Sequence, residues 1–222
     1  MLKIGMIGVG GISPSHRKPY QQLLREGLAE IVASCDLKAD RRANETCRHY
    51  TDLDTFFAQE AGNLDAVDIC LPSYYHAPVA IRAMEAGLHV LVEKPMALNY
   101  ADALEMCAAA KRTGKTLMVA QCLRFAPEID VVREMIASGE FGALKAADVR
   151  RDFGCLSTES WAWSQYGEKA GGALFDVHIH DIDWMQSVFG IPQSLSSGGK
   201  QVFPYSDRDI VSSQNKQGGE AV

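Results

Sequence analysis

The stretch KIGMIGVGGIS, residues 3–13, decides the fold. The apolar run from Lys3 to Val9 predicts a buried strand, and a glycine-rich turn separates it from a helix expected over Pro14 to Glu26. This order of strand, glycine turn and helix is the setting in which a dinucleotide pyrophosphate binds, because the N–H groups of the helix N-terminus point at the phosphates. Ser13 stands at the third glycine position of the GxGxxG spacing, so the match is partial.

Four residues of the turn are candidates for binding a cofactor. Gly8 permits the tight turn, and Gly10 lets the backbone approach a pyrophosphate. Gly11 and Ile12 complete the predicted loop. A glycine-rich turn that binds no ligand has the same sequence, so the loop alone leaves both interpretations open.

Asp36 ends the second predicted strand, residues 30–35. A carboxylate at that strand end accepts hydrogen bonds from the adenosine ribose diol and repels a 2′-phosphate, which favours NAD. Three basic residues follow and leave NADP open: Lys38, Arg41 and Arg42. In the alternative interpretation Asp36 caps a helix predicted over residues 39–49.

Short apolar runs alternate with helical segments as far as residue 120. Further strands are expected at residues 66–70, 88–92 and 116–120, and further helices at residues 53–60, 78–86 and 100–113. Repeated strand–helix–strand units predict an α/β fold, a doubly wound parallel sheet of the Rossmann type with helices on both faces.

Lys94 follows the apolar run of residues 88–92 and precedes Pro95. Parallel strands end at the edge of the sheet where open α/β folds bind ligands. The tripeptide Glu93-Lys94-Pro95 therefore places an ammonium group at the mouth of the expected cofactor site. Pro95 restricts the turn that directs the lysine, because its ring fixes φ and disfavours helix at the preceding residue.

Pro72 and His76 follow the predicted strand at residues 66–70. Their loop is expected to flank the nicotinamide end of a cofactor. The alternative role for His76 is that of a cap at the start of the next helix.

The alternation changes after residue 120. We expect a helix at residues 127–138, an extended strand at 144–152, a loop at 161–171 and a helix at 172–189. These segments predict a first domain at residues 1–120, a second domain at residues 121–193 and an atypical tail at residues 194–222, rich in Ser, Gly, Gln and Asn. A tether, a cloning artefact and a shifted reading frame all fit that tail.

Asp176, His180 and Asp183 fall on one face of the last predicted helix. A carboxylate one turn from an imidazole fixes its tautomer and raises its basicity, as a general acid/base requires. In the alternative, the acid complements the helix dipole and the histidine packs. His178 and His180 point about 200° apart on a helix, so no metal site is expected. Arg124 and Trp163 are weaker candidates for lining a substrate pocket.

The composition excludes several classes of partner. Twenty-two basic and 28 acidic residues give a net charge of −6 and a pI near 5.5, which argues against binding to nucleic acid or to an anionic membrane surface. Six cysteines without a CxxC pair fit a reducing cytoplasm. No apolar stretch reaches the roughly 18–20 residues of a membrane span, and no signal peptide is apparent.

Together these features resemble the Gfo/Idh/MocA oxidoreductases, the family of glucose–fructose oxidoreductase and inositol dehydrogenase. The resemblance covers residues 1–192 and rests on four elements: Gly8 to Ser13, Ala86 to Pro95, Arg124 to Pro127, and Gly171 to Ala173 leading to Asp176 and His180. It implies a Rossmann domain followed by an α+β domain of the dihydrodipicolinate-reductase type, which is incomplete in this chain.

The resemblance also implies chemistry: NAD or NADP as cofactor, and oxidation of a secondary hydroxyl of a sugar, inositol or related polyol. Lys94 matches the family's catalytic lysine, His180 its acid/base and Asp176 its orienting aspartate. A cis Lys94–Pro95 bond is expected. Complete members are expected to form homo-oligomers through a sheet that is largely missing here, so assembly of this chain is doubtful. An NAD-dependent glycoside hydrolase of the same fold, or an inactive or regulatory nucleotide-binding protein, are the alternatives.

Overall fold

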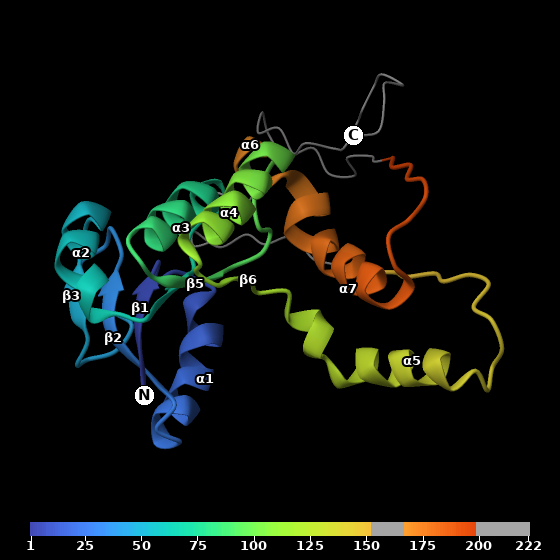
Figure 1. The fold of residues 1–222 in the computed structure, drawn as a ribbon, viewed down its shortest axis with the longest axis horizontal. Coiled ribbons are helices and arrows are strands. Elements are labelled where there is room, and N and C mark those ends of the chain that lie inside the picture. Colours follow the sequence, from blue (N-terminus) through green and yellow to red (C-terminus); the bar gives the residue numbers. More distant parts are fainter. Residues whose placement is uncertain (152–166, 199–222) are drawn as a thin grey trace. The chain divides into compact units, whose positions relative to one another are not determined.

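The computed structural model describes residues 1–151 and 167–198 of the 222-residue chain (Figure 1). The chain divides between Ala120 and Gln121 into two compact units. Each unit is described by itself below.

The first unit contains a six-stranded parallel sheet with the strand order β3-β2-β1-β4-β5-β6. The strands are β1 (Leu2–Ile7), β2 (Ala29–Cys35), β3 (Arg48–Tyr50), β4 (Ala66–Ile69), β5 (His89–Val92) and β6 (Leu117–Val119). The predicted doubly wound parallel sheet is therefore confirmed. The direction of winding reverses between β1 and β4, and open sheets bind ligands outside the carboxyl ends of the strands at such a switch point.

Helices connect these strands at bounds close to those predicted. They are α1 (Ser13–Arg25), α2 (Leu53–Glu60), α3 (His76–Glu85) and α4 (Tyr100–Thr113), with short 3₁₀ turns η1 (Ala61–Asn63) and η2 (Ser73–Tyr75). Asn99 caps α4 by accepting a bond from Asp102 N at 2.9 Å, and Gly114 ends the helix with φ at 68°. These local signals explain why the bounds of α4 agree with the sequence.

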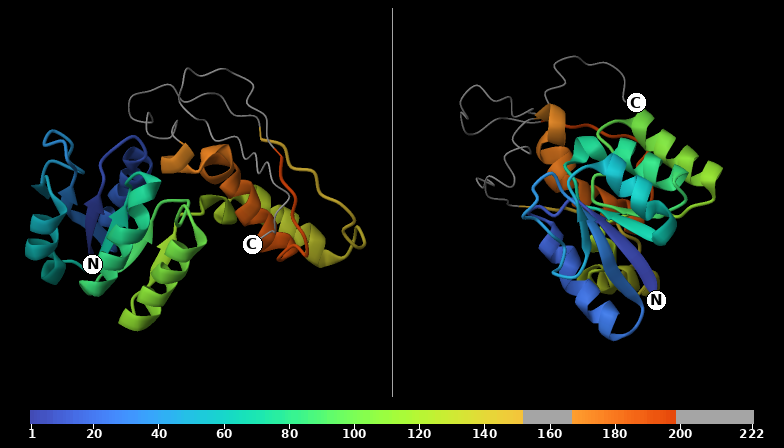
Figure 2. Two further views of the ribbon diagram at one scale, coloured as in Figure 1. Left: turned by 90° about the horizontal axis from the view of Figure 1, so that it is seen from above. Right: turned by 90° about the vertical axis from the view of Figure 1, so that its left-hand side faces the viewer.

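Two apolar clusters cover the two faces of the sheet. Ile7 of β1 belongs to the larger cluster, together with apolar residues of α2, α3 and α4. Ile4 and Met6 of the same strand belong to the smaller cluster, in which Tyr20 and Leu23 of α1 pack. Figure 2 shows α1 on one side of the sheet and α3 and α4 on the other. Successive strand residues point to opposite faces, so β1 contributes to both clusters.

The helix predicted over residues 39–49 is wrong. Residues 38–47 form turns and bends, and Arg48–Tyr50 is the edge strand β3, which the sequence pattern did not reveal. The carbonyl of the Asn44 side chain accepts bonds from Thr46 N and Cys47 N at 3.0 and 2.7 Å. Asparagine competes in this way with helical hydrogen bonding.

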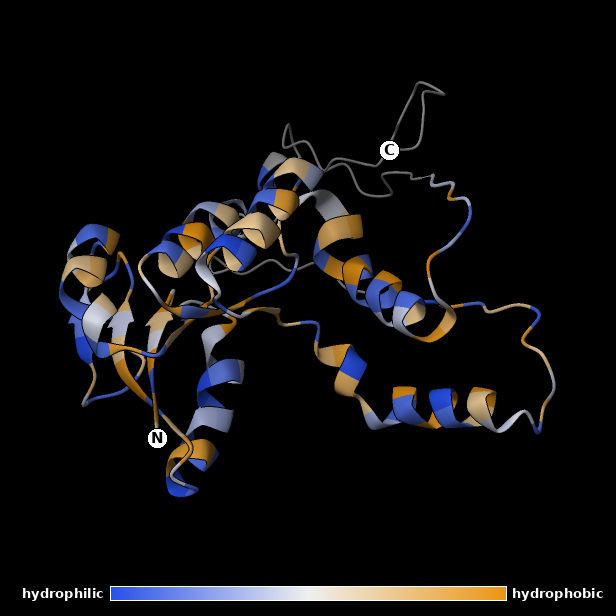
Figure 3. Ribbon diagram, in the orientation of Figure 1, coloured by the Kyte–Doolittle hydropathy of each residue, from blue (hydrophilic) through white to orange (hydrophobic). Residues whose placement is uncertain are grey.

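The regular elements of the second unit are all helical among the residues described. It contains η3 (Cys122–Phe125), α5 (Pro127–Ser138), α6 (Gly167–Ala170), the π-helical turn η5 (Leu174–His178) and α7 (Ile179–Phe189). The helix predicted at residues 127–138 is confirmed, and Gly139 ends it with φ at 69°. The helix predicted at 172–189 is also present, but a π turn interrupts it. Figure 3 shows apolar and polar residues interleaved along α5 and α7.

Two other predictions for the second unit are wrong over the residues described. Residues 144–151 form no strand, because an extended segment needs a pairing partner and the described part of the unit holds none. Residues 167–170 of the predicted loop at 161–171 form the helical turn α6. The rest of that loop up to residue 166, with Trp163, and the tail from residue 199 lie outside the described residues.

None of the helices within residues 1–151 and 167–198 combines the length and the apolar character needed to cross a membrane.

Candidate cofactor site and catalytic residues

Gly8 occupies the point where β1 comes closest to the end of β4. Its φ is 90°, and a Cβ atom built there would lie 2.6 Å from the backbone oxygen of Cys70. Any side chain would therefore meet backbone that cannot move aside, and the backbone conformation itself favours glycine. Gly8 thus sets the shape of the loop that follows.

Gly10 has a different environment. A Cβ atom added there would meet one described atom outside its chain neighbours within 4 Å, Nη1 of Arg41 at 3.8 Å. No side chain caps the N-terminus of α1 at Ile12, and its first turn contains no acidic residue. The backbone N–H groups of Ser13 and Ser15 donate to the carbonyls of Gly10 and Ile12 at 3.2 and 3.0 Å, so the glycine loop, with open space above Gly10, is the part that fits a pyrophosphate.

Asp36 links the end of β2 to the glycine loop. Its Oδ2 atom accepts a bond from Val9 N at 2.8 Å, and its Oδ1 atom accepts one from Lys38 N at 2.9 Å. The alternative in which Asp36 caps a helix at residues 39–49 is wrong, since no helix forms there and the next helix, α2, is capped by Asp52. A carboxylate has about four lone pairs, so Asp36 retains capacity to accept bonds from ribose hydroxyls.

Lys94 lies two residues after the end of β5, at the same carboxyl edge of the sheet. The Lys94–Pro95 peptide bond is cis, as the family resemblance predicted. The side chain of Lys94 is half-buried, and its backbone N–H donates to Oε2 of Glu93 at 3.0 Å. Because β5 neighbours β4, the lysine lies one strand away from the switch point.

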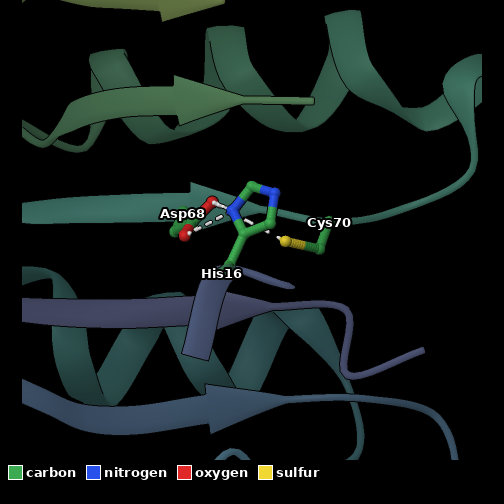
Figure 4. Close-up of side chains that lie close together, drawn as sticks. All are labelled: His16, Asp68 and Cys70. Carbon is green, nitrogen blue, oxygen red and sulfur yellow. Dashed lines mark hydrogen bonds and ion pairs between the residues drawn. The ribbon is translucent and has the colours of Figure 1, made fainter. Parts of the chain in front are cut away.

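Glu93 belongs to a buried polar network that the sequence did not reveal. Nε2 of His16 lies 2.8 Å from Oε1 of Glu93, and Nδ1 of His16 lies 2.9 Å from Oδ2 of Asp68. Figure 4 shows the imidazole beside Asp68, with Cys70 near the same nitrogen. An aspartate in the middle of the apolar strand Ala66–Ile69 was the one sequence signal that pointed to this network.

The network holds His16 as an imidazolium. Burial opposes protonation, but hydrogen bonds to Asp68, Cys70 and Glu93 outweigh it and raise the pKa of His16 to about 12. Burial also favours the neutral form of Glu93, yet the bond from His16 holds the pKa of that carboxyl below its usual value. Burial raises the pKa of the Cys70 thiol to about 12. The His16 imidazolium therefore forms hydrogen bonds with two carboxylates, those of Asp68 and Glu93.

His16, Asp68 and Cys70 bring three potential metal-binding atoms within 4.8 Å of one another. This is one ligand fewer than the four of a tetrahedral zinc site. The same atoms already bond to each other, since the Cys70 thiol donates to Oδ1 of Asp68 at 3.6 Å. These contacts are therefore interpreted as a hydrogen-bonded network and not as a metal centre.

Pro72 lies in the turn after β4, and His76 is the first residue of α3, which follows that turn. The side chain of His76 is buried, with Nδ1 2.7 Å from the carbonyl oxygen of Pro95 and Nε2 2.9 Å from that of Leu71. Burial lowers the pKa of His76, while both carbonyls favour its protonated form. The ring therefore joins the turn after β4 to the turn after β5 and offers neither nitrogen to a ligand.

The predicted acid/base pair lies in the second unit. Asp176 is in the π turn η5 and His180 is the second residue of α7; both are half-buried. Asp183, one turn beyond His180, forms two bonds of 2.6 Å with the guanidinium of Arg124. Arg124 therefore anchors α7 to η3, and its predicted place in a substrate pocket stays a prediction.

A second ion pair in this unit was not predicted. Arg151 donates two bonds of 2.7 Å to the buried carboxylate of Asp181, and Nδ1 of His178 lies 3.3 Å from the same carboxylate. The Arg151 guanidinium holds the pKa of Asp181 below its usual value. These contacts fix the first turn of α7, which carries His180.

The glycine loop, Asp36 and Lys94 at one edge of a doubly wound sheet define a nucleotide-binding domain of the Rossmann class. The chain belongs to the Gfo/Idh/MocA family: residues 2–121 match its oxidoreductase domain with NAD-binding Rossmann fold, and residues 129–216 match its C-terminal domain. The match over residues 2–121 makes the first unit the NAD-binding domain of this family.

Individual relatives carry different activities. The chain is 31% identical over 195 residues to D-glucoside 3-dehydrogenase of Escherichia coli, covering 86% of this chain and 55% of that protein. It is 30% identical over 154 residues to 2,7-anhydro-N-acetylneuraminate hydratase of the same organism, covering 69% and 41%. The chain spans less than two thirds of the length of these relatives.

A similar solved structure is the WlbA dehydrogenase of Bordetella pertussis, in complex with NADH and UDP-GlcNAcA. It is 28% identical in sequence, with a TM-score of 0.73, and covers 85% of this chain and 55% of its own.

Proposed function

We propose that this chain carries the cofactor-binding and acid/base residues of an NAD-dependent dehydrogenase that oxidises a secondary hydroxyl of a sugar, inositol or related polyol. The observation that carries the proposal is the position of Lys94 two residues after the end of β5, at the carboxyl edge that also holds the glycine loop. Membership of the family and the glucoside dehydrogenase among the relatives support it.

Different residues of the first unit would bind different parts of the cofactor. The loop from Gly8 to Ile12 and the N-terminus of α1 would hold the pyrophosphate, and Asp36 would accept bonds from the ribose diol. Pro72 and Glu93 belong to the turns beside the nicotinamide end. NAD supplies the hydride acceptor when it is bound.

The remaining residues handle the proton and the charge of the substrate. His180 takes the proton of the substrate hydroxyl as general base. The ammonium group of Lys94 stabilises the negative charge that develops on that oxygen. Asp176 orients the site and supports the charge of the imidazolium. Arg124 and Trp163 remain candidates for contacts to the substrate.

A second candidate keeps the same residues but gives no net oxidation. The hydratase among the relatives favours it. In such a lyase, hydratase or glycoside hydrolase, oxidation of the substrate is transient, and product forms without accumulation of NADH. A catalytically inactive nucleotide-binding protein is the third outcome that a test must separate.

The test is turnover of the full chain with NAD over a panel of sugars, glycosides and polyols, followed by NADH absorbance and by product analysis. Lys94→Ala and His180→Ala should each lower kcat by at least about 100-fold, the range found for charge stabilisation and general acid–base groups. Lys111→Ala and His89→Ala, at exposed positions of the first unit, are the matched controls. Full activity in both site variants would refute the assignment of Lys94 and His180 as catalytic residues.

A further inference from the structure

The residue on each side of Lys94 contacts a histidine, His16 on one side and the buried His76 on the other. Glu93 contacts His16 of α1, and the carbonyl oxygen of Pro95 contacts His76 of α3. The two distances are 2.8 and 2.7 Å. The histidines come from helices on opposite faces of the sheet, and both act on the same three-residue segment.

On the side of α1, the contacts form a continuous chain. The carboxylate of Asp68, fully buried in β4, fixes one nitrogen of His16, and the other nitrogen binds Oε1 of Glu93. Oε2 of Glu93 then accepts the bond from Lys94 N at 3.0 Å. The side chains of His16 and Glu93 are each 11% exposed, so little water competes for these bonds.

On the side of α3, His76 spans two neighbouring turns. Its side chain is 1% exposed, and its nitrogens contact the carbonyl oxygens of Pro95 and Leu71. Leu71 follows β4 and Pro95 follows β5, and these strands are adjacent in the sheet. The imidazole therefore fixes the spacing between the turn after β4 and the turn that carries Lys94.

Burying so many polar groups costs free energy that apolar side chains of similar size would not. These groups contribute to geometry instead, because each histidine makes one contact with the segment that carries the lysine, His16 with Glu93 and His76 with Pro95. We propose that His16 and His76 are positioning residues that together hold the backbone on both sides of Lys94. The catalytic meaning of this arrangement rests on the proposed function of Lys94, whereas the arrangement itself can be measured without turnover.

The experiment measures amide hydrogen exchange in the full chain, by NMR or by fragment-resolved mass spectrometry. His16→Leu and His76→Leu should each speed exchange at Lys94 by at least about 10-fold, because the segment that holds this amide loses one of its two side-chain contacts. Exchange in β1 should change by less than about twofold. His89→Leu, which alters an exposed histidine of the same strand β5, should leave Lys94 unchanged.

His16→Gln serves where His16→Leu does not fold, since it leaves one side-chain donor for Glu93. It should give an increase at Lys94 smaller than that of the leucine variant. A uniform rise in exchange over the whole first unit, or no rise at Lys94, would overturn the proposal. So would one equivalent of zinc that copurifies with the wild-type chain and is lost in His16→Leu, since the residues would then form a metal site.

NADH binding, followed by fluorescence, separates this inference from the proposed function. A local rise at Lys94 with NADH affinity kept within about threefold supports positioning of the lysine. Loss of NADH binding in both variants without a local rise at Lys94 contradicts it. Lys94→Ala tests the catalytic role independently, because its failure to lower turnover would leave the exchange result intact.

Discussion

The two units of this chain bury their apolar residues to different extents. Among the described residues, Ala170 is the single buried apolar residue of the second unit, whereas the first unit contains all the others. Large apolar side chains of the second unit are exposed instead: Phe125, Val131, Met135, Ile136, Phe141, Leu144, Ile191 and Leu195. Both units have well-formed helices, so helix formation does not account for the difference.

The parallel sheet of the first unit explains why its apolar residues are buried. In the first unit six paired strands offer two apolar faces, and each helix has a surface on which to pack. In the second unit α5 and α7 have amphipathic sequences, but the described residues include no strand against which to place them. Local sequence patterns can therefore fix a helix while leaving its apolar side exposed.

Substitution of one phenylalanine in each unit should show the largest difference in the free energy of unfolding. Phe56 is fully buried, whereas Phe141 is 69% exposed. Phe56→Ala should lower the free energy of unfolding of the first unit by about 4 kcal/mol, and Phe141→Ala should change that of the second by less than about 0.5 kcal/mol. Fluorescence of Trp184 in α7, with Trp161 and Trp163 replaced by phenylalanine, reports the second unit, and amide exchange in β1 and β4 reports the first. Equal losses of unfolding free energy in the two variants would refute the difference in burial between the units.

A pair of glycines tests which part of the cofactor loop serves the fold. Gly8→Ala should cost about 3 kcal/mol, because the new Cβ atom would meet the Cys70 carbonyl in a left-handed backbone conformation. Gly10→Ala should leave stability nearly unchanged and weaken NADH binding by at least about 10-fold, since its Cβ atom would enter the space open to phosphate. Urea unfolding and NADH titration measure the two effects. Equal stabilities for the two variants would contradict this division.

The smallest expected effect is a pH dependence confined to the first unit. The pKa of His16 is raised from 6.5 to about 12 by folding, so its contribution to stability is complete below pH 6.5 and declines as the pH rises. Between pH 6.5 and about pH 9 the first unit should lose about 2 kcal/mol, within the ceiling of about 1.4 kcal/mol per pH unit.

The second unit should respond on the acid side. Arg151 holds the pKa of Asp181 below 3.8, so that contribution is present above pH 3.8 and is lost as the pH falls further. The tryptophan transition should therefore stay constant between pH 6.5 and about pH 9. A first unit that is equally stable at both pH values would show that the buried imidazolium is not formed.

The sequence predicted those elements whose signals are local. Helix α4 has the expected bounds because Asn99 and Gly114 mark its ends. The segment at residues 39–49 has helix-forming composition, but Asn44 organises a turn there and β3 pairs with β2. Whether residues 144–151 become a strand depends on a partner that the segment itself does not encode.

The same distinction applies to the site. The glycine loop, Asp36 and Lys94 each follow a strand, and parallel strands bring them to one edge, so sequence reasoning could place them together. His16 and Glu93 are 77 positions apart, and their contact depends on how α1 lies over the sheet. No local pattern encodes that contact, although the polar residue Asp68 within an apolar strand marked the place.

The bond from Val9 N to Asp36 affects how binding energy is used. The carboxylate proposed to receive the ribose also orders the glycine loop, so the loop's conformational entropy is lost during folding and not when the nucleotide arrives. The two ends of the adenosine diphosphate subsite are therefore preorganised as one unit. A substitution at Asp36 should consequently reduce affinity for the diphosphate as well as selectivity at the ribose.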